Sequence, residues 1–218
     1  MSDYKTNVHY ALDIPCETVE LSGFLYLPEG AKGIVLFAHG SGSSRHSKRN
    51  NQVARALNQG GLGTLLFDLL TPQEEAVDKY TREFRFNIPL LASRLVEVSL
   101  WYQHDVDKPL SIGYFGSSTG GGAALIAAAM RPELVNAVVS RGGRPDLAGE
   151  YLPLVKAPTL LLVGGFDEAV IEMNRKAMGE MTCEVQLDII PEASHLFEEP
   201  GKLETVAEKT KNWFIEWL

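Results

Sequence analysis

The sequence predicts an α/β fold, with a mostly parallel sheet of about eight strands and helices on both faces. Apolar runs of strand length recur along the chain, and from residue 33 onward they alternate with segments of helical spacing. The chain has 218 residues, of which 45% are hydrophobic, so it can bury one sizeable core. We therefore expect a single domain that spans residues 1–218.

The apolar runs define the strands in order. Residues 8–14 and 19–28 flank a short polar turn, which predicts an antiparallel pair. The later predicted strands are residues 33–38, 62–70, 110–116, 135–140, 158–165 and 184–190. Because helical or mixed segments separate these later strands, we expect them to pair in parallel.

Helical spacing predicts most of the connections. The predicted helices are residues 47–59, 89–103, 119–130 and 203–217. The last of them has an apolar, aromatic face that is expected to cover the sheet, although it could equally pack on a partner, which leaves a homo-oligomer open. Residues 71–87 are polar and should form loop with some helix. The segment between residues 140 and 158 is too short for a large cap domain.

Composition and charge exclude several classes of protein. A net charge of −8 argues against nucleic acid and against anionic membranes as partners. The first residues lack an apolar signal core, and no apolar run is long enough to cross a membrane. Cys16 and Cys183 are the only two cysteines, which does not suggest a disulfide scaffold. We expect a cytoplasmic protein.

A nucleophile is predicted directly after the strand at 110–116. The stretch GSSTG fits the pattern Gly-x-Ser-x-Gly in one frame, from Gly116 to Gly120, with Ser118 at the apex. A strand before the pattern and a helix after it are the context of a strained turn that exposes a serine hydroxyl. The alternative is a Ser/Gly-rich connection that only caps the helix.

A serine hydroxyl needs a base to remove its proton, and the expected chain order is serine, acid, histidine. His195 is the one histidine after Ser118, and it follows the last predicted strand. Asp167 comes first after the glycine turn that ends the strand before, with Glu168 as the neighbouring alternative. A solvated histidine and an aspartate that caps a helix are the other interpretations of these residues.

Backbone N–H donors for a developing oxyanion are expected at two places. The amide of Ser41, in the loop after residues 33–38, is one candidate, and the amide of Thr119, next to the nucleophile, is the other. His39 in the same loop is predicted to be structural.

This loop also permits a rival interpretation. Gly40-Ser41-Gly42 after a strand resembles the start of a dinucleotide-binding motif, and Asp68 would then bind the ribose. Arg45 stands at the third glycine position, however, which argues against a dinucleotide-dependent oxidoreductase. Asp68 is better explained as a hydrogen-bonded residue at a strand end.

Four stretches resemble the α/β-hydrolase superfamily and, within it, the dienelactone-hydrolase-like family: LFAHGSGSS, IGYFGSSTGGGAAL, LLVGGFDEAV and EASHLFEEPG. The resemblance extends over nearly the whole chain. It implies an eight-stranded sheet with strand two antiparallel, and hydrolysis of esters or lactones without a cofactor; no metal is expected either. It implies that Ser118 is the nucleophile, Asp167 the acid and His195 the base.

The chain departs from this family at one position. Dienelactone hydrolases present a cysteine at the apex of the turn, whereas Ser118 stands there in this chain. The expectation therefore moves from a dienelactone substrate to a general serine esterase that acts on a small ester or lactone. A ligand-binding protein on the same fold is the alternative.

Two basic clusters in this acidic chain bear on the substrate. Arg45, Lys48 and Arg49 follow residues 33–38, and Arg141 and Arg144 follow residues 135–140. One hypothesis is that Arg49, Arg141 or Arg144 binds a carboxylate on the substrate through bidentate hydrogen bonds. The alternative is that these arginines pair with acidic residues or cap helices.

Overall fold

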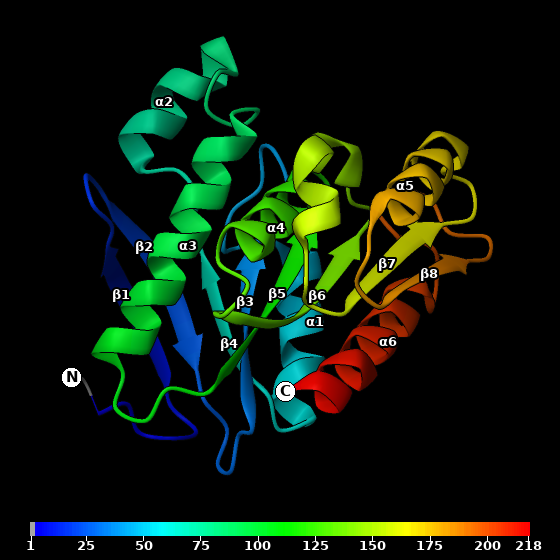
Figure 1. The fold of residues 1–218 in the computed structure, drawn as a ribbon. Helices are drawn as coiled ribbons and strands as arrows, with labels where there is room; N and C mark the ends of the chain where they lie inside the picture. Colours follow the sequence, from blue (N-terminus) through cyan, green and yellow to red (C-terminus); the bar gives the residue numbers. More distant parts are fainter. Residues whose placement is uncertain (1–2) are drawn as a thin grey trace.

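An eight-stranded sheet lies at the centre of the computed structural model, which describes residues 3–218 (Figure 1). The strand order is β1-β2-β4-β3-β5-β6-β7-β8. The strands are β1 (His9–Pro15), β2 (Glu20–Tyr26), β3 (Gly33–Ala38), β4 (Gly63–Phe67), β5 (Ser111–Ser117), β6 (Val135–Arg141), β7 (Thr159–Gly164) and β8 (Val185–Ile190). Strand β2 runs antiparallel to both of its neighbours and the other pairs are parallel, which confirms the predicted architecture.

Helices cover both faces of the sheet. They are α1 (Lys48–Gln59), α2 (Pro72–Thr81), α3 (Ile88–Asp105), α4 (Thr119–Met130), α5 (Glu168–Glu180) and α6 (Lys202–Trp217), with a 3₁₀ segment η1 (Pro145–Leu154). Helices α1 and α6 pack on one face, and α3, α4 and α5 pack on the other (Figure 1). In the part of the chain that the structure describes, no helix combines the length and apolar character needed to span a membrane.

The central strands are buried on both sides because their side chains alternate between two cores. In β3, Ile34 and Leu36 point into the core under α3 and α4, whereas Val35 and Phe37 point into the core under α1 and α6. The aromatic face of α6 packs on this second core, with Phe214 fully buried. The sequences of these strands are therefore continuously apolar and do not alternate between apolar and polar residues.

Helix α2 is the element that the sequence predicted least well. It occupies the polar segment that was expected to be loop with some helix, and its start has an explicit cause. The Thr71 hydroxyl accepts from the Glu74 amide, and the Glu74 carboxylate accepts from the Thr71 amide at 2.8 Å. Glu74 also forms an ion pair with Arg94 of α3, which joins α2 to α3.

The contact between β5 and α6 leads to a test of the packing. A Cβ atom added at Gly113 would lie 2.5 Å from the Phe214 ring, so Gly113→Ala should lower the free energy of unfolding by about 1–3 kcal/mol. Gly179 of α5 is the matched control, because beyond its own stretch of helix backbone no atom of the described residues lies within 4 Å of the added methyl group. Gly179→Ala should leave stability unchanged or raise it by up to about 1 kcal/mol. Urea denaturation measures both; equal effects at the two positions would contradict the packing described.

Candidate active site

Ser118 lies in a strained turn between β5 and α4. Its backbone angles are φ 52° and ψ −122°, a sparsely populated conformation for a residue other than glycine. Two neighbouring segments hold it there. Its N–H donates to the Arg141 carbonyl at 3.2 Å, and its carbonyl accepts from the amides of Gly121 at 2.9 Å and Arg144 at 3.0 Å.

The two flanking glycines are required by the close approach of α4 to the sheet. A Cβ atom at Gly116 would lie 2.5 Å from the Gly120 carbonyl oxygen, and one at Gly120 would lie 2.1 Å from the Ala38 carbonyl oxygen. No side chain fits at either position without moving the backbone. The pattern predicted from the sequence is thus a consequence of packing as well as of turn geometry.

The structure brings the predicted acid and base together. Asp167 Oδ2 lies 2.5 Å from His195 Nδ1, and the imidazole is partly exposed. Asp167 stands at the start of α5, yet its carboxylate makes no capping bond to the helix. Glu168, the alternative acid, is the first residue of α5. A carboxylate on Nδ1 fixes the imidazole orientation and leaves Nε2 for other chemistry.

The loop that carries His195 is anchored at both ends. The Phe166 amide donates to the Ala193 carbonyl at 2.9 Å, which joins this loop to the end of β7. Further along, the fully buried ring of Phe197 packs in the core under α1 and α6. The position of the imidazole is therefore set by backbone bonds and by a buried aromatic side chain.

The end of β6 connects the serine to the histidine. Arg141 O accepts the Ser118 amide, and the next residue, Gly142, lies against the imidazole: a Cβ atom there would be 3.4 Å from His195 Cε1. Gly40, in the loop after β3, lies close to the serine: a Cβ atom added at Gly40 would be 3.1 Å from Ser118 Cβ. Ser118, His195 and the loop after β3 thus all lie at the carboxyl edge of the sheet, although no hydrogen bond joins Ser118 to His195 among the described residues.

His39 shapes that loop. Its Nε2 accepts from the Leu69 amide at 3.0 Å, so Nδ1 carries the proton and donates to the Gly40 carbonyl at 3.0 Å. Burial lowers the pKa of His39 below its usual value, which keeps the ring neutral. The side chain joins β3 to the end of β4, as expected for a structural histidine.

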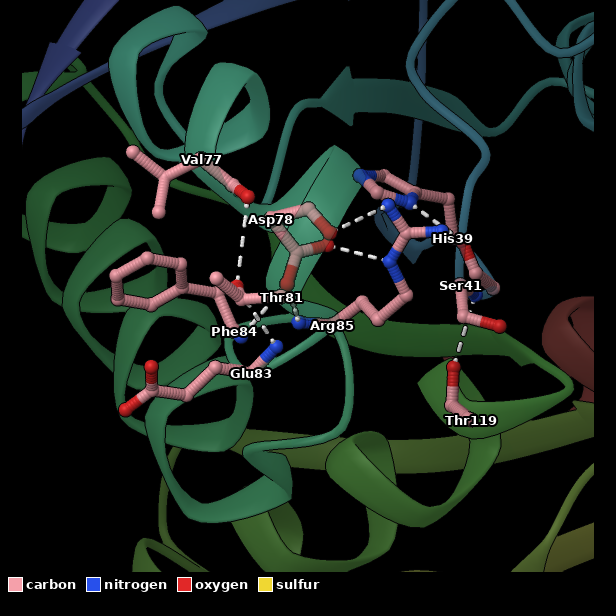
Figure 2. Close-up of polar contacts among 10 residues, drawn as sticks. His39, Ser41, Val77, Asp78, Thr81, Glu83, Phe84, Arg85 and Thr119 are labelled. Atoms are coloured by element: carbon pink, nitrogen blue, oxygen red, sulfur yellow. Dashed lines mark hydrogen bonds and ion pairs between the residues drawn. The ribbon is translucent and has the colours of Figure 1, made fainter.

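Ser41 and Thr119, the residues of the two predicted oxyanion donors, are hydrogen-bonded to each other, which the sequence did not predict. The Ser41 amide donates to the Thr119 hydroxyl at 2.9 Å (Figure 2). The Ser41 N–H is therefore engaged by a side chain rather than directed at open space. Thr119 is the first residue of α4, where a helix has no internal partner for its amide.

Asp68 is occupied by Arg45. Its Oδ1 accepts from the Arg45 amide at 2.7 Å, and its Oδ2 accepts from the Arg45 guanidinium. The carboxylate therefore fastens the loop after β3 to the end of β4. This is the strand-end role expected from the sequence, and it leaves the carboxylate unavailable to a ribose.

A pocket adjoins this loop and includes residues of α2 that sequence reasoning missed. Its lining residues are His39, Gly40, Ser41, Gly42, Ser43, Leu69, Leu70, Glu75, Asp78, Arg85 and Leu91. Arg85 extends from Asp78 toward His39 and Ser41 (Figure 2), and a Cβ atom at Gly42 would lie 3.5 Å from its Nη1. Segment 71–87 thus forms one wall of the pocket, and no sequence motif marks Arg85 within it.

Asp78 holds Arg85 in place. Its carboxylate is almost fully buried and accepts from the Arg85 side chain and from the amides of Phe84, at 2.7 Å, and Arg85, at 3.0 Å. Burial alone would raise the pKa of Asp78, but the hydrogen bonds from Arg85 and Phe84 hold it below its usual range. The carboxylate stays charged and fixes one edge of the guanidinium.

The three arginines proposed from the sequence have different surroundings. Arg144 donates to both oxygens of Asp146, at 2.8 and 2.7 Å, so a carboxylate of the chain itself occupies it. Arg49 donates to Glu198 at 2.9 Å through Nη1. Arg141 is 7% exposed, and its Nε and Nη1 find no hydrogen-bond partner among the described residues.

Comparisons with known proteins show the family and the fold of the chain. A family model described as the dienelactone hydrolase family matches residues 21–218. The crystal structure of a dienelactone hydrolase from Anabaena variabilis is 59% identical, covers 97% of this chain and 98% of its own, and superposes with a TM-score of 0.95. A serine hydrolase without a lid from Xanthomonas campestris is 21% identical, covers 98% of this chain and 97% of its own, and has a TM-score of 0.78, which supports the fold alone.

Two curated relatives are longer than this chain. Both come from strains of Mycobacterium tuberculosis, are provisionally named as phosphoribosyl transferases, and are 55% identical over 201 residues. The match covers 92% of this chain but 44% of each relative. The chain thus spans less than half the length of these proteins, and their name describes the longer polypeptides.

The buried state of His39 leads to a pH test. Its pKa is lowered on folding, so the unfolded chain binds a proton more readily, and the stability that a neutral His39 contributes is lost as pH falls below about 6.5. Below that pH, protonation of His39 in the unfolded chain lowers the free energy of unfolding by up to about 1.4 kcal/mol per pH unit. His39→Gln should remove this contribution, whereas His104→Gln, at an exposed site in α3, should not. Urea denaturation at pH 7.5 and 5.5 measures the difference; parallel behaviour of the two variants would contradict the assignment.

Proposed function

The chain belongs to the dienelactone hydrolase family, and from this premise we propose that it is a serine hydrolase that cleaves a small carboxylic ester or lactone. The observation that carries the proposal is the strained turn that holds Ser118 at the sheet edge where Asp167 and His195 meet. The α/β-hydrolase fold supports a hydrolase in general; the nucleophile and the type of ester are the parts we propose.

In the proposed reaction, His195 Nε2 takes the proton of Ser118 as Oγ attacks the acyl carbon. Asp167 holds the ring through Nδ1 and stabilises the imidazolium that forms. The alcohol or the opened end of the lactone leaves with that proton, and an acyl-enzyme remains. Water then attacks the acyl group with the same imidazole as base, which returns the free serine and a carboxylic acid.

The oxyanion of this reaction would be received at the start of α4. The amide of Thr119 is free of helical partners and stands at the positive end of the helix dipole. The amide of Ser41 can serve as the second donor only if the Thr119 hydroxyl shares or releases it. Rotation of one threonine side chain is a small change, so both donors remain part of the proposal.

The acyl substrate that we propose is small or flexible. The pocket beside the Ser41 loop would not hold it as it stands, because the volume of about 10 Å³ suits a single water molecule. Its apolar wall is formed by Leu69, Leu70 and Leu91, and its polar wall includes Glu75 and Arg85. The walls come from loops, α2 and α3 rather than from a separate cap. The chain offers no cysteine at the turn: Cys16 and Cys183 lie elsewhere and are free thiols, which suits the reducing cytoplasm that we propose as its location.

Covalent labelling tests the nucleophile. Ser118→Ala should abolish labelling by a fluorophosphonate probe and hydrolysis of a short aryl ester, because the attacking oxygen is gone. Ser117→Ala is the matched control: its hydroxyl is buried at the end of β5, and labelling should persist. Mass spectrometry of the labelled peptide gives the site. Loss of labelling in the Ser117 variant alone would mean that the nucleophile is misassigned, and a wild type that binds esters without turnover would support the ligand-binding alternative.

Substitution of the acid tests the pairing with His195. Asp167→Asn should lower kcat by about 10⁴-fold with little change in stability, because the amide favours the wrong imidazole tautomer. Glu168→Gln, one residue away at the start of α5, should have little effect. Steady-state kinetics on the same aryl ester compares them. Near-normal turnover of Asp167→Asn beside a strong loss in Glu168→Gln would move the acid to Glu168.

A further inference from the structure

Arg141 carries a buried charge that nothing in the described chain neutralises. It is the last residue of β6 and is 7% exposed, yet its Nε and Nη1 have no hydrogen-bond partner among residues 3–218. Buried polar groups are almost always bonded, and an unpaired buried cation costs several kcal/mol. Such a group indicates a missing anionic partner.

Other arginines at this edge of the sheet make the contrast clear. Each of three arginines has a carboxylate of its own: Arg45 with Asp68, Arg85 with Asp78, and Arg144 with Asp146. Arg141 has none in the part of the chain described here. A protein with 28 acidic and 20 basic side chains does not lack carboxylates to place there. Arg141 thus differs from these three arginines in having no carboxylate partner among the described residues.

The position of Arg141 places it beside the proposed reaction centre. Its carbonyl accepts the Ser118 amide, and the following residue lies against the His195 ring. Side chains alternate along β6, so Arg141 shares with Val139 the face that α1 and α6 cover. Its guanidinium lies over the ring of Phe115 at 5.9 Å, which offsets part of the cost of burial.

A second guanidinium lies close by. Arg49, in the first turn of α1, also has a buried Nε without a partner in the described residues. Burial, and then the positive charge of Arg49, lower the pKa of Arg141 to about 10, so Arg141 remains charged at neutral pH. Glu198 accepts one hydrogen bond from Arg49 but is itself largely exposed. Arg49 and Arg141 thus bring two positive charges to this end of the sheet, where Glu198 is the one carboxylate paired with either of them among the described residues.

The groove next to Arg49 extends this positive surface. It is lined by Gly42, Ser43, Ser44, His46, Ser47, Lys48 and Arg49, and none of these lining residues is acidic. The Ser44 and Ser47 oxygens accept backbone amides of their own loop, which leaves their hydroxyl hydrogens to donate. The groove also contains the N-terminus of α1, whose free amides and dipole favour an anion.

We propose that Arg49 and Arg141, together with this groove, bind a phosphate group carried by the substrate. The proposal deepens the function proposed above and rests on it only for the claim that the phosphate belongs to a substrate. The anion site itself does not depend on that function. One guanidinium edge satisfies a carboxylate, whereas a phosphate has three terminal oxygens to share among two guanidiniums and several hydroxyls. The reaction remains hydrolysis of the acyl ester, and the phosphate serves as a handle that is not transferred.

Binding of inorganic phosphate to the Ser118→Ala protein tests the site without any turnover. Isothermal titration should detect phosphate, and acetate at equal ionic strength should bind far more weakly. Arg141→Gln and Arg49→Gln should each weaken phosphate binding about 10- to 100-fold, because each removes charge-assisted hydrogen bonds. Arg144→Gln is the matched control, because Asp146 already occupies that guanidinium. Glu198→Gln should tighten binding, because it releases Arg49.

Two further variants separate binding from folding. Arg141→Lys keeps the charge but loses the planar fork, so it should bind phosphate more weakly than wild type and more tightly than Arg141→Gln. Arg49 is partly exposed on a helix, so Arg49→Gln should fold even if the Arg141 variants do not. Equal phosphate affinity in wild type and Arg49→Gln, or acetate affinity equal to that of phosphate, would overturn the proposal.

Kinetics then distinguish this proposal from the proposed function. Wild type should show a higher kcat/KM on the acetyl ester of glycerol 3-phosphate than on monoacetylglycerol or acetoxyacetate, and the preference should shrink in Arg49→Gln but not in Arg144→Gln. Hydrolysis of all three esters without preference would overturn the phosphate site and leave the hydrolase intact. Phosphate binding without hydrolysis of any ester would support the site and contradict the hydrolase.

Discussion

The strained backbone of Ser118 is the constraint on which the rest of the site depends. A residue other than glycine keeps such angles only where its neighbours over-determine them. Here the amide of Ser118 is bound by β6, its carbonyl by the amides of Gly121 and Arg144, and α4 behind it is buried through most of its length. The two cores on either side of the sheet thus supply the stability that keeps this hydroxyl at the carboxyl edge.

The other parts of the site are arranged around that fixed point. His195 and Asp167 stand on loops that backbone hydrogen bonds join to the end of β7, and Gly142 lies against the imidazole. His39 and Asp68 hold the loop after β3 against the end of β4 without contributing a reactive group. Strand β5 and helix α4 set the position of the serine, whereas the base and the Ser41 amide come from loops that hydrogen bonds hold to the strand ends.

Much of this could be predicted from the sequence because it depends on local patterns. Alternating strands and helices indicate the sheet, and each of Ser118, Asp167 and His195 follows its own strand in the expected order. Other features depend on tertiary contacts that no local pattern records. Strand composition does not reveal that the Arg141 side chain is buried without a hydrogen-bond partner among residues 3–218, since that depends on register and on the helices above it.

The central proposal is that Ser118 Oγ and His195 Nε2 come within hydrogen-bonding distance of each other when the serine reacts. A crystal structure of the protein with a phosphonate bound covalently at the active site measures this directly. The account predicts that phosphorus is attached to Ser118 Oγ and that His195 Nε2 lies about 2.6–3.2 Å from that oxygen, the range of a productive hydrogen bond. An adduct on another residue, or an imidazole beyond the reach of Oγ in an ordered loop, would contradict it.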